Sequence, residues 1–271
     1  MRFVNRQPGR GSRLLLALLP LLLVIAIYVL GSSHRLAENP DDKLLPSIGQ
    51  MADAIERMAF TEDPRTGEYL LWTDTLASLQ RLGLGIGIAA IIGLVLGMAS
   101  GVFPLLRASL SPLLAVISMI PPLAILPILF ILFGLDELSK VMLIVIGITP
   151  VLARDLERRA REIPREVLIK ALTLGANSWT LVLRVALPQL LSRLLESLRL
   201  MLGAAWLFLI SGEAISATAG LGYRIFLVRR YMAMDVILPY VFWITLLAWF
   251  MDWALRQLNR RCFPWSEGVR A

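Results

Sequence analysis

Histidine and cysteine are almost absent from this chain of 271 residues, which contains one of each, His34 and Cys262. A single cysteine excludes an intramolecular disulfide. The scarcity of both types also excludes the usual zinc sites and Cys–His nucleophile pairs. A membrane-embedded enzyme that depends on such groups is therefore disfavoured, and we expect neither catalytic residues nor metal ligands in this chain.

A phosphate-binding P-loop is also missing. The sequence has no G-x-x-x-x-G-K-[ST] stretch and no Gly-Lys pair, and a P-loop needs this glycine-rich backbone and its lysine to hold phosphates. We therefore expect no cofactor to be bound by this chain, so that any ATP and Mg²⁺ would bind a separate ATPase subunit. The same absence fits a transporter driven by an ion gradient, so it argues only against a transporter fused to its own ATPase.

Charged residues are scarce too, at 17% of the chain against roughly 25% in soluble domains. The mean hydropathy is +0.71, and several segments approach the ~20 apolar residues that cross a bilayer. These features predict an all-α, polytopic membrane protein. In such a protein the net charge of +7 reflects topology, because basic residues collect on the cytoplasmic side, and no nucleic-acid partner is expected.

We expect six transmembrane helices. They lie at about Leu14–Leu30, Leu82–Val102, Pro112–Phe133, Leu138–Ala153, Leu190–Ile215 and Val236–Leu255. The first resembles a secretory signal, but its apolar run is longer than the usual signal core, so we expect an uncleaved anchor.

The charges along the chain predict its orientation. The N-terminal arm has four arginines and no acid, and basic residues also gather in residues 154–188, whereas residues 31–74 hold nine acids and four bases. The positive-inside rule then puts both termini in the cytoplasm. The expected division is a cytoplasmic arm and first transmembrane helix (1–30), a periplasmic segment (31–74), a transmembrane core (75–255) and a cytoplasmic tail (256–271).

Three stretches carry signals of local structure. Ser47–Ala59 has apolar residues at the spacing of a surface helix. The second span has a small residue every four positions, which lets another helix approach closely, at Gly85, Ala89, Gly93, Gly97 and Gly101. The third span contains four prolines, which predict a kinked or broken helix, at Pro112, Pro121, Pro122 and Pro127.

The stretch KALTLGANSWTLVLRVALPQLL (170–191) is amphipathic and interrupted by glycine and proline. Pro164 suits a first helical turn, Gly175 suits a left-handed C-terminal cap, and Asn177 or Ser178 can cap a second short helix. We predict two short helices meeting at a right angle on the cytoplasmic side, at about 164–188. They either lie on lipid or fill a groove on a cytoplasmic partner, and periodicity alone leaves both open.

The pattern ALTLGA followed by VALP, with Pro188 thirteen residues after Gly175, resembles the cytoplasmic-loop signature of bacterial ABC importer permeases. The usual glutamate is absent, and only Ala171 and Gly175 match. Three further segments resemble the nitrate/sulfonate/taurine/bicarbonate branch of these binding-protein-dependent permeases, and the whole resemblance covers roughly residues 75–265. The segments are SMIPPLAILPILFILFGLDELSK (118–140), LRLMLGAAWLFLISGEAISATAGLGYRI (198–225) and RRYMAMDVI (229–237).

The resemblance implies a multi-pass protein of the bacterial inner membrane that is a non-catalytic permease subunit. Its partners would be a second permease subunit in a homodimer, cytoplasmic ABC ATPase subunits, a periplasmic substrate-binding protein and the lipid bilayer. The solute would be small and polar, either nitrate-, sulfonate- or taurine-like or a small organic nitrogen compound. The coupling-helix residues expected to dock on the ATPase are Lys170, Ala171, Leu172, Gly175, Ala176, Trp179 and Pro188.

Charges inside the spans are functional candidates, because they are costly at membrane depth. Glu213 either lines the translocation path, with Trp206, Ser211 and Ser216 as companions, or pairs with another span. An ion-coupled secondary transporter that uses Glu213 is the main alternative function, and a scaffold without transport is another. Further charges have structural interpretations: Arg193, Glu196 and Arg199 pair along one helix, and Asp252 pairs with Arg256.

The segment 217–231 is expected to be an external loop, in which Gly220 and Gly222 permit a tight turn. By resemblance, its arginines would meet acidic groups of the extracytoplasmic binding protein. These are Arg224, Arg229 and Arg230. Packing against the acidic segment from Glu38 to Asp74 is an equal alternative for them.

Overall fold

The computed structural model describes residues 9–40, 42–64 and 66–266, without the side chains of Arg10 and Leu14. The first arginines of the N-terminal arm and the last five residues of the expected tail therefore lie outside the described residues. All regular structure in the described ranges is helical. The chain divides into two units, one of residues 1–69 and 228–240 and the other of residues 70–227 and 241–271.

The smaller unit contains α1 (Arg10–Glu38) and α2 (Ile48–Ala59). The helix expected at 47–59 is confirmed as α2. Ser47 caps it in a reciprocal arrangement. Its hydroxyl accepts from the Gln50 backbone N–H, and the Gln50 side chain accepts from the Ser47 N–H. A side chain of α1 also binds the segment that connects α1 to α2, since the Tyr28 hydroxyl donates to the Pro46 carbonyl at 2.7 Å.

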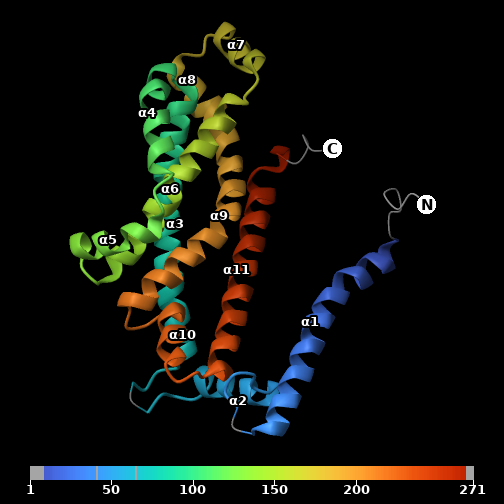
Figure 1. Cartoon of the computed structure of the whole chain (residues 1–271). Helices are drawn as coiled ribbons and strands as arrows, with labels where there is room; N and C mark the ends of the chain where they lie inside the picture. The colour runs from blue at the N-terminus through green and yellow to red at the C-terminus, as the bar shows by residue number, and fades with distance from the viewer. Residues whose placement is uncertain (1–8, 41, 65, 267–271) are drawn as a thin grey trace. The chain divides into compact units, whose positions relative to one another are not determined.

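The larger unit is built around long helices, and its last two α-helices share residues with the smaller unit. The elements are α3 (Leu70–Val102), α4 (Pro104–Ile117), η2 (Pro122–Ile125), α5 (Leu126–Phe133), α6 (Glu137–Arg161), α7 (Arg165–Thr173), α8 (Ser178–Leu181), the π-turn η3 (Val182–Ala186), α9 (Leu187–Ser216), α10 (Leu221–Arg229), α11 (Met234–Cys262) and η4 (Pro264–Ser266). Within this unit α3, α6 and α9 run together, with α7 and α8 at one end and α10 at the other (Figure 1).

The small residues of α3 form the seam against α6, as predicted. A methyl group added at Gly97 would lie 2.7 Å from the Ala153 carbonyl oxygen, and one added at Gly101 would lie 2.3 Å from the Ala160 side chain. Ala89 in the same row is fully buried. The two backbones are thus in direct contact, which only small side chains permit.

The proline-rich third span is broken, as predicted. Its two halves, Pro104–Ile117 and Pro122–Phe133, meet at 80° across a short break. Pro121 and Pro122 lie at this break, where neither can donate a backbone N–H to continue the helix. Gly134, with a φ of 76°, ends α5 in a conformation that glycine adopts without strain.

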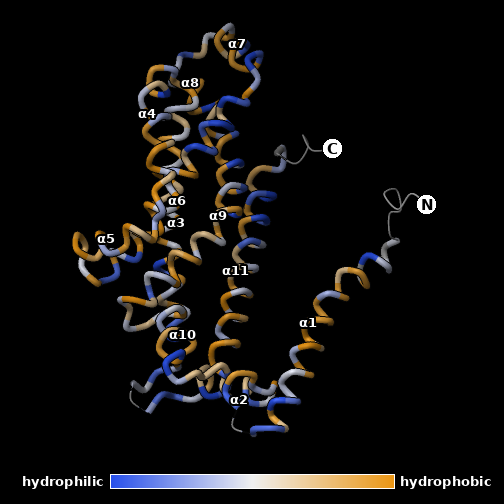
Figure 2. The backbone as a smooth tube through the Cα atoms, in the orientation of Figure 1, coloured by the Kyte–Doolittle hydropathy of each residue, from blue (hydrophilic) through white to orange (hydrophobic). Residues whose placement is uncertain are grey.

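Four helical stretches of the described chain are long and apolar enough to cross a membrane, and the bent pair would make five. The four are Gly11–Glu38, Leu70–Val102, Ser178–Ser216 and Met234–Cys262. The expected fourth span falls within α6, which is not among them because its C-terminal half is strongly charged. A count of six therefore stays a prediction. In Figure 2, α11 changes from orange turns to blue turns towards its C-terminal end, where Arg260 and Arg261 lie.

Candidate functional site

The turn between α7 and α8 has a defined backbone geometry. The Ala176 N–H donates to the Ala171 carbonyl and the Gly175 N–H donates to the Leu172 carbonyl, both at 3.0 Å. This is the Schellman arrangement, and its left-handed residue is Gly175, with a φ of 86°. The cap predicted at Gly175 is confirmed as a structural feature.

The second short helix, α8, is capped by Asn177, one of the two residues predicted to cap it. The Asn177 side-chain oxygen accepts from the Thr180 backbone N–H at 2.7 Å. The helix then continues through the π-turn into α9, where Pro188 occupies the first turn. The segment is therefore a short exposed helix, a capped turn and the start of a long helix.

Several apolar side chains are exposed at this end of the larger unit, where α7 and α8 lie (Figure 1). Leu172 is 53% exposed, Leu174 80% and Trp179 67%. Of the other expected docking residues, Lys170 and Gly175 are exposed, while Ala171, Ala176 and Pro188 are half-buried. A cluster of this kind on a turn suits a partner surface or a lipid surface.

The opposite end of the same unit holds a buried polar network centred on Arg81 of α3. Its guanidinium Nη1 donates to Glu213 Oε1 of α9 and to the Ala219 carbonyl oxygen, each at 2.7 Å. Nη2 donates to Glu137 Oε1 of α6 at 2.8 Å, and Nε makes a second contact with the same carboxylate. Arg81 is only 5% exposed, so one cation joins three helices and a loop.

Glu213 is fully buried, and both of its oxygens are occupied. Oε1 accepts from the Ser78 hydroxyl at 2.7 Å in addition to Arg81, and Oε2 accepts from the Gly222 N–H at 2.8 Å. The expected pairing with another span is therefore present, and the expectation that Glu213 lines the translocation path stays a prediction. Its carboxylate is directed towards α3 and the turn after α9.

The three companions of Glu213 differ from one another. The Ser211 hydroxyl donates to the Leu207 carbonyl, and the Ser216 hydroxyl donates to the Gly212 carbonyl. Trp206 is 4% exposed, and its Nε1 has no hydrogen-bond partner among the described residues. Thr149 Oγ1 of α6 is also buried and without a partner in this part of the chain.

Arg224 is held within its own chain. It donates to Asp74 at 2.8 Å and 3.3 Å, and Asp74 is fully buried and also accepts from the Gly220 N–H at 2.8 Å. This pairing with the acidic segment is the alternative that we left open for Arg224. The expected loop 217–231 is instead largely helical, since α10 occupies most of it.

The two remaining arginines of that segment, Arg229 and Arg230, are exposed. Gly220 provides the predicted tight turn, with a φ of 135°. Gly222 has another role, because a side chain there would meet the Ile210 carbonyl oxygen at 2.7 Å.

Sequence reasoning missed the residues of α3 that build this network. Asp74, Ser78 and Arg81 are spaced by four and three, which places them on one face of a helix. Lys140 of α6 was missed as well; it is 2% exposed and contacts Glu137 at 3.3 Å. Polar residues at helical spacing just before an apolar run were the available signal.

Further ion pairs connect the long helices near the α7 end. Asp155 of α6 accepts from the Ser197 hydroxyl of α9 and from Arg159 on its own helix at 2.7 Å. The expected pair Arg193–Glu196 is present at 3.3 Å, and so is Asp252–Arg256 at 2.8 Å. Arg199 differs from expectation, because it pairs with Asp252 of α11 at 2.7 Å rather than along α9.

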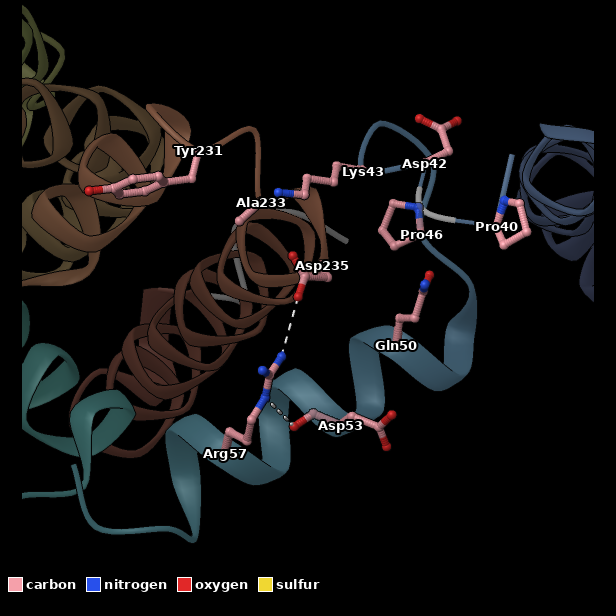
Figure 3. A pocket seen from close by; sticks show the side chains of 10 residues that line it. All are labelled: Pro40, Asp42, Lys43, Pro46, Gln50, Asp53, Arg57, Tyr231, Ala233 and Asp235. Atoms are coloured by element: carbon pink, nitrogen blue, oxygen red, sulfur yellow. Dashed lines mark hydrogen bonds and ion pairs between the residues drawn. The ribbon is translucent and has the colours of Figure 1, made fainter. Parts of the chain in front are cut away.

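The smaller unit has an open pocket of about 810 Å³, shown in Figure 3. Side chains from α2 and from the start of α11 face it, and Arg57 contacts Asp235 across it at 3.4 Å. Lys43, Asp42 and Asp53 add charges of both signs to its lining. In the described residues no group of three or more His, Cys, Asp or Glu could hold a metal ion.

With four helices long and apolar enough to cross a membrane, the described chain has the organisation of a multi-pass membrane protein. Residues 89–263 match the family described as binding-protein-dependent transport system inner membrane component, and the chain belongs to this family. It is therefore a permease subunit of an ABC transport system, which implies that it is not itself catalytic. The predicted membership of the nitrate/sulfonate/taurine/bicarbonate branch is confirmed by the relatives.

Three curated relatives are similar over most of their length. The taurine transport system permease protein of Escherichia coli K12 is 34% identical over 200 residues, covering 74% of this chain and 73% of the relative. The bicarbonate transport system permease protein of Synechococcus elongatus is 33% identical over 199 residues, covering 70% and 71%. A putative aliphatic sulfonates transport permease protein of Bacillus subtilis is 28% identical over 190 residues, covering 70% and 69%.

A solved structure has the same fold. The methionine ABC transporter MetNI in an inward-facing conformation aligns with a TM-score of 0.64 over 72% of this chain and 96% of the matched chain, at 21% identity. The predicted all-helical permease fold is thereby confirmed.

Proposed function

We propose that this chain is one of two identical subunits of an ABC importer in the bacterial inner membrane. Each subunit would have six spans, with both termini in the cytoplasm. The pair would accept a small polar solute from a periplasmic binding protein and release it inside the cell. Membership of the binding-protein-dependent family supports this role and gives no support to an ion-coupled carrier.

The observation that carries the mechanism is the exposed, capped turn between α7 and α8. A cluster that includes Leu172, Leu174 and Trp179 stands on a rigid Schellman turn. An amphipathic helix of this kind can fill a groove on a partner. We assign that groove to a cytoplasmic ATPase subunit, whose movement would be transmitted through α8 and the π-turn into α9.

Cysteine labelling tests this docking. In a Cys262→Ser background, a cysteine replaces Trp179, which is 67% exposed, or Thr61 as an exposed control. We expect maleimide to label both positions in the isolated subunit, and the ATPase partner to protect only the first. Equal labelling at position 179 with and without the ATPase would argue against the docking surface.

The solute is proposed to be a small oxyanion of the sulfonate or carboxylate type. Two relatives carry sulfonate-type or bicarbonate transport in their names. Buried donors without a described partner, Trp206 Nε1 and Thr149 Oγ1, suit an anionic acceptor. Glu213 contributes no free carboxylate to repel an anion, because Arg81 neutralises it.

Vesicles containing the complete transporter can test both the energy source and the solute. We expect uptake of radiolabelled taurine to require ATP together with the ATPase and binding protein. Trp206→Phe should lower uptake roughly tenfold, the value of one hydrogen bond to a charged group, without lowering thermal stability. Uptake by this chain alone, driven by a proton or sodium gradient, would overturn the proposal.

A further inference from the structure

A second pocket lies where α3 ends, at the base of α7. Its volume is about 280 Å³. Three arginines line it, together with side chains that are mainly apolar, among them Ile163, Leu168 and Leu181; the arginines are Arg107, Arg161 and Arg165. They come from α4, the end of α6 and the start of α7, so the pocket is assembled by three separate helices.

The charged side chains of this pocket are all basic, because no acid among the described residues lines it. Arg107 is held in place by backbone carbonyl oxygens at the end of α3, donating to Ser100 at 3.0 Å and also to Gly101. Arg161 and Arg165 are exposed, and neither forms an ion pair with any acid in the part of the chain that the structure describes. Two guanidinium groups are therefore available to an anion.

The pocket lies at the end of a candidate membrane span, since Leu70–Val102 finishes at its lining residue Val102. Immediately beyond, Leu105 is 88% exposed and Leu106 is 43% exposed. Apolar side chains at this level contact acyl chains, while headgroup phosphates lie at the level where the hydrocarbon ends. Basic pockets between helices at that depth suit anionic headgroups.

We propose that this pocket binds the phosphate of an anionic phospholipid. Arginine presents a planar fork of N–H donors that matches phosphate oxygens, so Arg161 and Arg165 can each make paired charge-assisted hydrogen bonds. The exposed Leu105 and Leu106, which lie in the sequence between the lining residues Val102 and Arg107, favour a lipid over a free phosphate ion, because only a lipid has acyl chains for them to contact. A bound headgroup would connect α4, α6 and α7, and it does not depend on which solute is transported.

The test compares lipid binding by the purified full chain and by three single variants. Native mass spectrometry in detergent measures retention of phosphatidylglycerol against phosphatidylcholine. Arg161→Gln and Arg165→Gln remove pocket charges, and Arg184→Gln is the matched control, because Arg184 is exposed and lies outside the pocket lining. Phosphatidylglycerol affinity should fall about fivefold for each pocket variant and stay unchanged in the control.

Three results would overturn the inference. The first is an equal loss of affinity in Arg184→Gln, which would mean that surface charge alone attracts the lipid. The second is displacement of the lipid by millimolar inorganic phosphate, and the third is equal retention of phosphatidylcholine. Either of these two would exclude an anionic lipid as the ligand. Thermal stability of each variant without lipid checks that the fold is intact.

Discussion

Arg81 on α3 and Glu213 on α9 lie 2.7 Å apart, although 132 residues separate them in the sequence. Arg81 is 5% exposed and Glu213 is fully buried. Removing one partner of such a pair leaves an uncompensated buried charge, whereas removing both can be nearly neutral. The pair therefore fixes how α3 and α9 meet.

A double-mutant cycle at this pair gives the first prediction. Arg81→Met should lower the free energy of unfolding by about 3–5 kcal/mol, because Glu213 then stays buried without its cation. Glu213→Gln should be milder, since Arg81 keeps its ion pair with Glu137 and the single amide oxygen can still accept from Ser78. The double variant should be more stable than the sum of the single losses predicts, measured by thermal unfolding in detergent. Strict additivity would show that the two side chains are not coupled.

The seam between α3 and α6 gives the second prediction, with its control in the same helix. Gly97→Ala should destabilise the protein by about 1–3 kcal/mol, because the added methyl group would lie 2.7 Å from the Ala153 carbonyl oxygen. Gly87 has nothing within 4 Å of an added methyl group, so Gly87→Ala should be neutral or stabilising by roughly 0.5–1 kcal/mol. Unfolding midpoints that rank the two variants in the reverse order would contradict this packing.

The third prediction concerns the left-handed residue of the α7–α8 turn. Valine at position 175 would face a penalty of about 1–2 kcal/mol for a positive φ, so Gly175→Val should distort the turn and abolish stimulation of the ATPase by the permease. Asparagine tolerates this conformation, so Gly175→Asn should retain most of the stimulation. Both variants should insert into the membrane normally. Equal stimulation by both would mean that the turn does not transmit the signal.

The fourth prediction is a pH effect in the segment after α1. The hydrogen bond from Arg35, followed by the Leu44 backbone N–H, holds the pKa of Asp42 below its usual range. Because the pKa is lowered by folded contacts, their stabilisation is present above the ordinary carboxyl pKa and is lost as the pH falls through the lowered value. The protection factor of the Leu44 amide, which donates to Asp42 at 3.0 Å, should therefore fall only in acid. In Arg35→Gln this loss of protection should begin at higher pH.

Local signals in the sequence were sufficient for elements whose cause lies within a few residues. The helix at 47–59, the cap at Gly175 and the break at Pro121–Pro122 all follow from neighbouring residue types. The seam of α3 was equally predictable, because its small residues repeat at the helical period.

Contacts between distant helices were not predictable in the same way. Nothing near Glu213 in the sequence indicates that it pairs with Arg81 and Ser78, and Arg199 pairs with Asp252 on another helix rather than with a neighbour on its own. The segment 217–231 was expected to be an external loop because of the predicted order of the spans. Most of it is helical because Asp74, Ser78 and Glu213 accept the N–H groups of Gly220, Leu221 and Gly222, which fixes the start of α10.

The helical stretch from Ser178 to Ser216 runs for 39 residues without a non-helical break. At 1.5 Å per residue the path along this helix is roughly 58 Å, with the capped turn at one end and Glu213 near the other. A displacement of the capped turn would therefore be carried along one continuous helix, in which the π-turn at Val182–Ala186 interrupts the α-helical hydrogen bonding. This π-turn is the position at which the helix can change its backbone geometry. It would therefore set how much of a movement of the α7–α8 turn reaches the Glu213 end of α9.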